Sequence, residues 1–140
     1  MGKLYLTSQF RNVADIVAKQ LKNKQKGKRV LFILTAAEGE GGNQDWLNDD
    51  RSALQNMGLE TINYTLTGKK QGDFEKDFKD IHYVFVSGGN TFYLLEKAQE
   101  SGFIKFIKKY MQKDNVYFGS SAGSVIAGPD IYPVLRLDSL

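Results

Sequence analysis

The sequence contains no cysteine, two prolines and a single histidine in 140 residues. Without cysteine the chain has no disulfide bond, no thiolate nucleophile and no cysteine-ligated zinc. This composition is typical of a reducing compartment, and we expect a cytoplasmic location. No apolar run has the length of a signal peptide or a membrane-spanning helix, so no membrane partner is expected.

A strong charge bias is also missing, since the formal net charge is only +3. Lysines are concentrated around residues 19–29, but no aromatic residues are interleaved with them. We interpret this stretch as a solvated helix end and expect no nucleic-acid partner. The length fits a single domain over residues 1–140, and an apolar fraction of 41% is ordinary for a globular protein.

Short β-rich segments alternate with longer amphipathic segments, which is typical of βαβ units around a mostly parallel sheet. Helices are predicted after Ser8, Asn43 and Asn90, where apolar residues recur at helical spacing. Phe92, Leu95 and Gln99, one turn apart, mark the third of these helices, and a fourth is predicted near residues 103–111. Strands are predicted at Lys3–Thr7, Arg29–Thr35, Glu60–Leu66, Tyr83–Ser87 and Val116–Gly119.

Residues 115–127 form a strand, a sharp turn and a helix in this interpretation, and Gly119–Gly123 matches the pattern G-x-S-x-G at the turn. A serine on such a turn has strained backbone angles and an exposed hydroxyl, and only small residues fit around it. The helix after Ser121 directs free N–H groups at the hydroxyl, which helps to stabilise negative charge. The pattern predicts Ser121 as a nucleophile, with a plain glycine-serine turn as the alternative.

A second segment, residues 83–91, repeats this arrangement: a buried strand ends at Gly88 and Gly89, and a helix opens at Asn90. Two glycines let the backbone approach a ligand and expose its amides, and the helix N-terminus completes an anion pocket. In a serine hydrolase such amides form the second arm of an oxyanion hole. Considered alone, the segment is better explained as a plain turn with an asparagine cap. Because both motifs follow parallel strands, we expect them at the same edge of the sheet.

A third glycine cluster, Glu38–Asn43, also follows a predicted strand. It lacks the lysine of a phosphate-binding loop, and its two carboxylates would repel phosphate. We therefore predict that it forms a loop on the rim of the active site.

Taken together, Ser87–Phe92 and Gly119–Gly123 resemble the peptidase E (aspartyl dipeptidase) family, which also includes the cyanophycinases. The segments Leu4–Ser8 and Phe32–Ala36 are similar as well, and the likeness extends to about Pro133. The resemblance implies a fold like that of class I glutamine amidotransferases: a flavodoxin-like, three-layer α/β sandwich with a doubly wound, mostly parallel sheet.

The resemblance also implies a function: serine peptidases of this family hydrolyse short peptides, notably dipeptides with an amino-terminal aspartate. On this likeness Ser121 is the nucleophile that forms an acyl-enzyme, and the backbone amides of Gly88 and Ala122 are the oxyanion donors. Gly89 and Asn90 are expected to bind the substrate. The family needs no metal and no organic cofactor, so none is expected here.

The sequence departs from the family pattern after the serine motif, where the family's catalytic histidine and its acidic partner lie. The only histidine, His82, precedes the strand that ends at Gly88, which puts it roughly 20 Å from the catalytic rim. Asp130 and Asp138 follow the motif, but an acid without a histidine completes no triad. We therefore expect a C-terminally truncated peptidase that is inactive as it stands, with uncovered core surface that favours self-association, for example as a homodimer.

Two other functions stay open at this point. The first is a pseudo-enzyme that captures a peptide or carboxylate without cleaving it. The second is a flavodoxin-like nucleotide binder with phosphate at the start of the helix after Gly89, although the sequence has no phosphate-binding loop.

Overall fold

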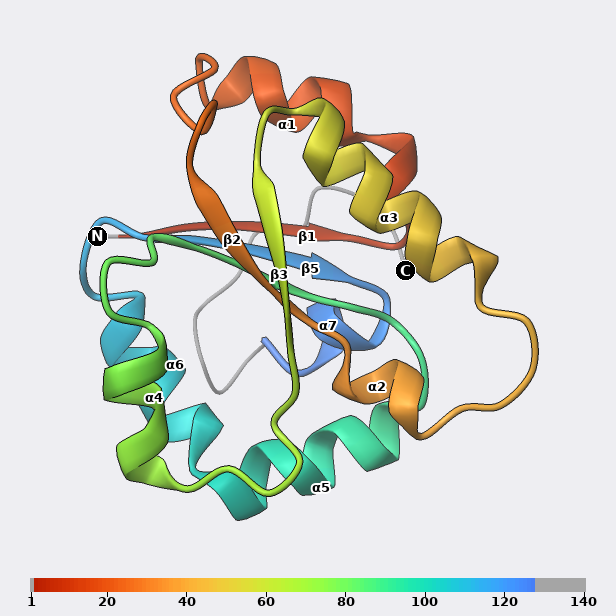
Figure 1. The fold of residues 1–140 in the computed structure, drawn as a ribbon, viewed down its shortest axis with the longest axis vertical. Helices are drawn as coiled ribbons and strands as arrows, with labels where there is room; N and C mark the ends of the chain where they lie inside the picture. The colour runs from red at the N-terminus through yellow and green to blue at the C-terminus, as the bar shows by residue number, and fades with distance from the viewer. Residues whose placement is uncertain (1, 128–140) are drawn as a thin grey trace.

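Five short runs rich in β-branched and aromatic residues form one parallel sheet in the computed structural model, which describes residues 2–127 (Figure 1). The strand order is β1-β5-β4-β2-β3, so the chain crosses over the sheet in both directions, as in a doubly wound fold. The prediction of an α/β fold with a parallel sheet is confirmed. The strands are β1 (Lys3–Thr7), β2 (Arg29–Ile33), β3 (Glu60–Tyr64), β4 (Tyr83–Val86) and β5 (Val116–Ser120).

Helices connect these strands, and several begin and end where the sequence predicts. Asn90 precedes α5 and accepts a hydrogen bond from the Tyr93 amide at 2.9 Å, while Gly102 ends the helix at a φ of 83°. The short helices α2 and α4 were not predicted. The helical segments are η1 (Phe10–Asn12), α1 (Ala14–Gln20), α2 (Thr35–Glu38), α3 (Asp45–Asn56), α4 (Gln71–Asp77), α5 (Thr91–Ser101), α6 (Phe103–Tyr110) and α7 (Ala122–Val125).

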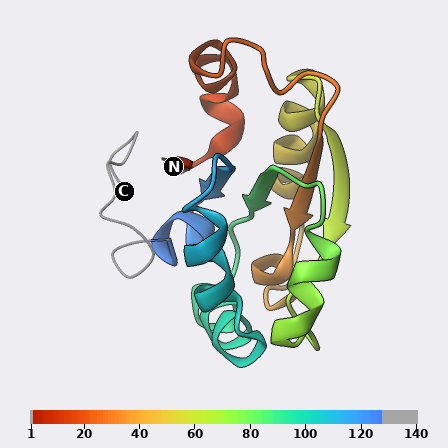
Figure 2. The ribbon, with the colours of Figure 1, turned by 90° about the vertical axis from the view of Figure 1, so that its left-hand side faces the viewer.

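The sheet is buried on both faces, because successive side chains of a strand point to opposite sides. In β2, Val30 and Phe32 pack toward α1 and α3, whereas Leu31 and Ile33 pack toward α4, α5 and α6. Figure 1 shows these two helical layers on either side of the sheet, and Figure 2 shows the same separation after a quarter turn. The three-layer arrangement explains why the central strands are apolar at consecutive positions.

One helical stripe differs from the sequence pattern. Phe92 is 85% exposed and Leu95 is 38% exposed, whereas Leu94 and Ala98 are fully buried. Both sets of residues have helical spacing, so periodicity alone admits either face. The packing of α5 against α2, α6 and α7 selects the face with Leu94. Within residues 2–127, no helix is both long enough and apolar enough to cross a membrane.

Candidate active site

Ser121 occupies a strained turn between the end of β5 at Ser120 and the start of α7 at Ala122. Its φ is 53° and its ψ is −112°, a conformation that costs a residue with a side chain about 1–3 kcal/mol. The side chain of Ser121 is exposed, in contrast to its buried neighbours Ser120 and Ala122. The predicted strained turn with an exposed serine is therefore present.

The glycines around Ser121 are required because the turn packs directly on neighbouring backbone. A Cβ atom at Gly123 would collide with the carbonyl group of Val86 in β4. A Cβ atom at Gly119 would lie 3.0 Å from the Gly123 carbonyl and from the Cα of Ser124. Small residues at these positions therefore let β4, β5 and α7 meet closely at the turn.

Two further serines, Ser120 of the motif and Ser124 directly after it, connect this turn to β1 and η1. The Ser120 Oγ accepts a hydrogen bond from the Phe10 amide at 3.1 Å. The Ser124 Oγ accepts from the Thr7 amide at 2.9 Å and donates to the Thr7 carbonyl at 2.8 Å. Ser120 and Ser124 are buried, so only Ser121 presents its hydroxyl to the surface.

The second predicted motif lies directly beside Ser121. A Cβ atom at Gly88 would be 3.1 Å from the Cβ and 3.6 Å from the Oγ of Ser121. Gly89 has a φ of 134°, and a Cβ there would collide with the Ala36 carbonyl. Neither the Gly88 amide nor the Ala122 amide has a hydrogen-bond acceptor among residues 2–127. The fold thus brings the two motifs together, with two unpaired amides next to the serine.

A cavity of about 240 Å³ opens beside these two turns. It includes Glu40 of the third glycine cluster, in agreement with the prediction that this loop lies on the rim. Asn90 is not part of its lining, because the Asn90 carboxamide caps α5 instead. The lining residues are Ser8, Gln9, Arg11, Glu40, Trp46, Asp50, Gly88, Gly89, Ser120 and Ser121.

Sequence reasoning did not single out Arg11 and Asp50 of this lining. The Arg11 amide and its Nη1 donate to the Asp50 Oδ1 at 3.0 and 3.3 Å. Asp50 is 1% exposed, and burial raises the pKa of its carboxyl, although the charge of Arg11 acts in the opposite direction. A signal was present in the sequence, since Asp50 shares the buried stripe of α3 with Leu47 and Leu54.

His82 lies at the opposite end of the sheet, as predicted. Its Nδ1 is 2.9 Å from the Asn115 Oδ1, just before β5 begins. Asn115 precedes Ser121 by six residues, so the imidazole is about 20 Å away along the strand. Asp130 and Asp138 lie outside the residues that the structure describes. Within residues 2–127 no cluster of three or more metal-ligating side chains occurs.

Comparison with known proteins places this geometry in context. The model of peptidase family S51 matches residues 1–139. The chain is 32% identical to an uncharacterized peptidase of Listeria monocytogenes, over 99% of this chain and 67% of that protein. It is 33% identical to peptidase E of Citrobacter koseri, over 93% of this chain and 52% of that protein.

Solved structures agree with this result. A crystal structure of a candidate peptidase E protein from Listeria monocytogenes matches with a TM-score of 0.82 at 30% identity, over 91% of this chain and 62% of that one. A peptidase from an acI-B1 Actinobacterium shares the fold, with a TM-score of 0.66 at 22% identity. The chain spans about two thirds of the length of the Listeria peptidase and about half of the Citrobacter peptidase E.

Proposed function

The chain belongs to peptidase family S51, the family of the peptidase E proteins, and from this premise we propose that it acts on short peptides through an acyl-enzyme on Ser121. One observation carries the proposal: an exposed serine on a strained turn lies beside Gly88 in the lining of a cavity, and the amides of Gly88 and Ala122 have no acceptor among residues 2–127. In the proposed reaction the Ser121 Oγ attacks the peptide carbonyl carbon, and the amides of Gly88 and Ala122 bind the resulting oxyanion. The base that took the proton of the Ser121 hydroxyl gives it to the amine nitrogen, the amine leaves, and water then hydrolyses the ester.

The hydroxyl of Ser121 needs a base to accept its proton, because an unassisted serine is a weak nucleophile. His82 is the only histidine of the sequence, and it lies at the far end of the sheet. We therefore infer that the base comes from outside residues 2–127. The 140-residue chain by itself should bind peptide and acylate slowly.

The charges of the cavity support a small, charged peptide as the substrate. Arg11 is the one cationic side chain among the described residues that line the cavity, and its Nη1 already pairs with Asp50. Its other N–H groups can donate to the side-chain carboxylate of an amino-terminal aspartate. Gly89 lines the same space, and in the proposed complex it contacts the peptide backbone. A preference for aspartyl dipeptides is therefore part of the proposal.

A peptide-binding protein without hydrolytic activity is the second candidate, because the only histidine of the sequence, His82, lies at the far end of the sheet from Ser121. A nucleotide-binding role is less well supported. Two carboxylates, those of Glu40 and Asp50, line the cavity and would repel phosphate.

Adding imidazole as an external base tests the role of Ser121. With acetyl-alanine 4-nitrophenyl ester as the acyl donor, imidazole should raise the rate of covalent acylation by at least about tenfold, since a general base contributes roughly 10²–10⁴-fold to such reactions. The readout is the added acyl mass, mapped to its residue by peptide mass spectrometry, because imidazole also hydrolyses the free ester.

Ser121→Ala should remove the adduct, whereas Ser52→Ala, which changes an exposed serine of α3, should leave it intact. Acylation of Ser121→Ala at the rate of the unmodified protein would refute the nucleophile assignment. Rapid acylation without imidazole that depends on Ser121 would refute the expectation that the 140-residue chain acylates slowly.

A further inference from the structure

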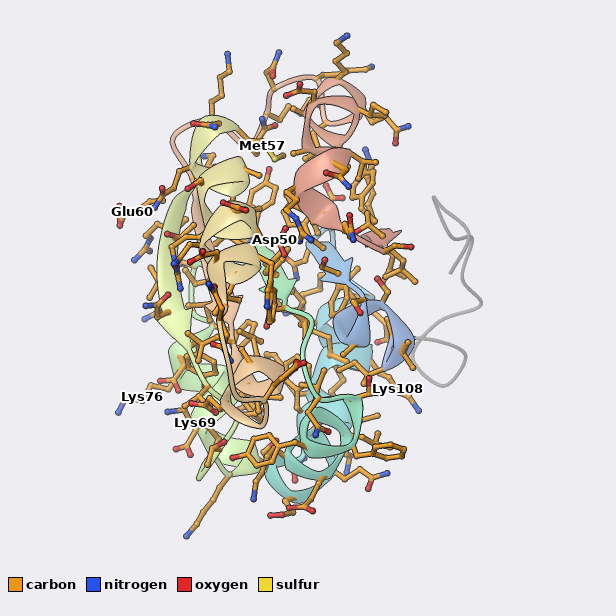
Figure 3. The ribbon with its side chains drawn as sticks, turned by 90° about the vertical axis from the view of Figure 1, so that its right-hand side faces the viewer. Asp50, Met57, Glu60, Lys69, Lys76 and Lys108 are labelled. Atoms are coloured by element: carbon orange, nitrogen blue, oxygen red, sulfur yellow. The ribbon has the colours of Figure 1, made fainter. Side chains whose placement is uncertain are left out.

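The carboxyl group of Asp50 has no part in the reaction proposed above, yet it borders the same cavity as Ser121. It lies on the side of α3 that faces η1 and α1 (Figure 3). Its Oδ1 accepts both hydrogen bonds from Arg11, but its Oδ2 is buried and has no partner among residues 2–127. A buried carboxylate oxygen without a donor is unusual, because burial removes the water that would otherwise solvate it.

A purely structural role explains the Oδ1 of this carboxyl group, which accepts hydrogen bonds from Arg11, but not its unpaired Oδ2. The hydrogen bond from the Arg11 amide to the Oδ1 fixes the backbone of η1, which follows β1. An asparagine at position 50 would accept the same hydrogen bond. Burial raises the pKa of Asp50 despite the nearby guanidinium, so the fold does not favour the ionised form. A neutral amide would therefore suit a merely structural position better than the acid does.

Asp50 is one of the residues that line the cavity, so a ligand bound there lies next to this side chain. Asp50 and Glu40 supply two negative charges to the lining and Arg11 supplies one positive charge, which is already paired with Asp50. The excess negative charge favours a positively charged ligand group, and an ammonium group can donate to the free Oδ2.

We propose that Asp50 binds a primary ammonium group of the substrate, beside Ser121. This inference rests on the proposed peptidase function. Every unblocked peptide carries such a group at its amino terminus, about 2.5 Å from the first carbonyl carbon. A carboxylate that binds it must therefore share a cavity with the nucleophile, as Asp50 does. A lysine side chain is the other source of the same chemistry.

Binding measurements on the Ser121→Ala protein, which prevents turnover, test the proposal. Calorimetric titrations would compare Ala-Phe, acetyl-Ala-Phe and acetyl-Lys-Phe. Ala-Phe should bind at least tenfold more tightly than acetyl-Ala-Phe, and Asp50→Asn should remove this advantage while leaving the Kd of acetyl-Ala-Phe unchanged. If acetyl-Lys-Phe rather than Ala-Phe responds to Asp50→Asn, the ammonium group is that of the side chain.

Asp49→Asn is the matched control, because it removes the neighbouring but exposed carboxylate of the same helix. It should change no Kd at a pH where Asp50 is fully ionised, since the charge of Asp49 acts on Asp50 only by raising its pKa. Equal affinity for acetyl-Ala-Phe, Ala-Phe and acetyl-Lys-Phe in the protein with Asp50 intact would overturn the proposal, even if Asp50→Asn failed to fold. An unchanged Kd of both Ala-Phe and acetyl-Lys-Phe in a folded Asp50→Asn protein would overturn it too.

The pH dependence of the affinity for Ala-Phe distinguishes ligand binding by Asp50 from a purely structural role, which would not change it. Arg11 and Asp49 are the charged groups that act on Asp50, and Glu40 shares its cavity. Affinity for Ala-Phe should rise as pH increases through the raised pKa of Asp50 and fall as the α-amino group deprotonates near pH 8. The rising limb should be absent in Asp50→Asn.

Failure of this proposal is distinguishable from failure of the peptidase function. The acetylated ester in the acylation experiment has no ammonium group, so its reaction with Ser121 does not depend on Asp50. Loss of that reaction would refute the peptidase function while leaving the binding result valid.

Discussion

Replacing Gly123 by alanine is expected to prevent the chain from folding stably. The new Cβ atom would collide with the Val86 carbonyl oxygen and lie 2.7 Å from the carbonyl carbon. Both groups belong to backbone, and β4 cannot move away without losing its pairing with β5 at Val86 and Gly119. We expect a loss of at least about 4 kcal/mol, a large part of the 5–15 kcal/mol that stabilises a typical domain.

Thermal unfolding followed by circular dichroism would measure this effect. Gly72→Ala is the matched control, because a Cβ at this exposed position in α4 meets nothing within 4 Å. That control should stabilise the protein by about 0.5–1 kcal/mol through its higher helix propensity. A Gly123→Ala protein that unfolds cooperatively at the same temperature as the original would show that the turn does not pack against β4 as described.

Replacing Ser121 by glycine is expected to abolish acylation and to stabilise the protein. The change removes the only hydroxyl of the motif that is exposed, so no acyl adduct should form at this residue. It also relieves the strain of a φ of 53°, which should raise the free energy of unfolding by about 1 kcal/mol. Opposite effects on reactivity and stability are typical of a functional site whose geometry is held by its surroundings.

Two comparisons separate these effects. Ser121→Ala should lose acylation without the gain in stability, because alanine keeps the Cβ atom. Lys22→Gly changes an exposed residue with a φ of 55° far from the motif in sequence, and should gain stability while acylation persists. Urea unfolding gives the free energies. A Ser121→Gly protein that is less stable than Ser121→Ala would contradict the idea that this turn is strained.

Much of the fold could be predicted from local patterns. Apolar runs bounded by turns located all five strands, and Asn90 and Gly102 marked both ends of α5, because caps act within one turn of the helix. The predicted end of β2 at Thr35 is too late, since Thr35 already begins α2. The predicted end of β3 at Leu66 is also too late, since the strand ends at Tyr64. The resemblance to the peptidase E family is confirmed by the family match and by the relatives. The catalytic roles of individual residues remain predictions.

Part of the site could not be read from the sequence. Arg11 and Asp50 are 39 residues apart and meet only because η1 packs against α3. The hydrogen bonds of Ser120 and Ser124 could not be predicted for the same reason. Their partner residues belong to β1 and η1, more than a hundred residues away in sequence. Residue type and spacing carry no information on such contacts until the strand order is known.

The sequence by itself determined the parallel α/β architecture and the two glycine motifs, because backbone conformation at strands, caps and tight turns depends on neighbouring residues. Only the tertiary structure decided which side chains surround Ser121, because β1, β4 and β5 bring together segments that are distant along the chain. It also decided that Asp50 is buried with one oxygen unpaired, since burial depends on how the layers pack.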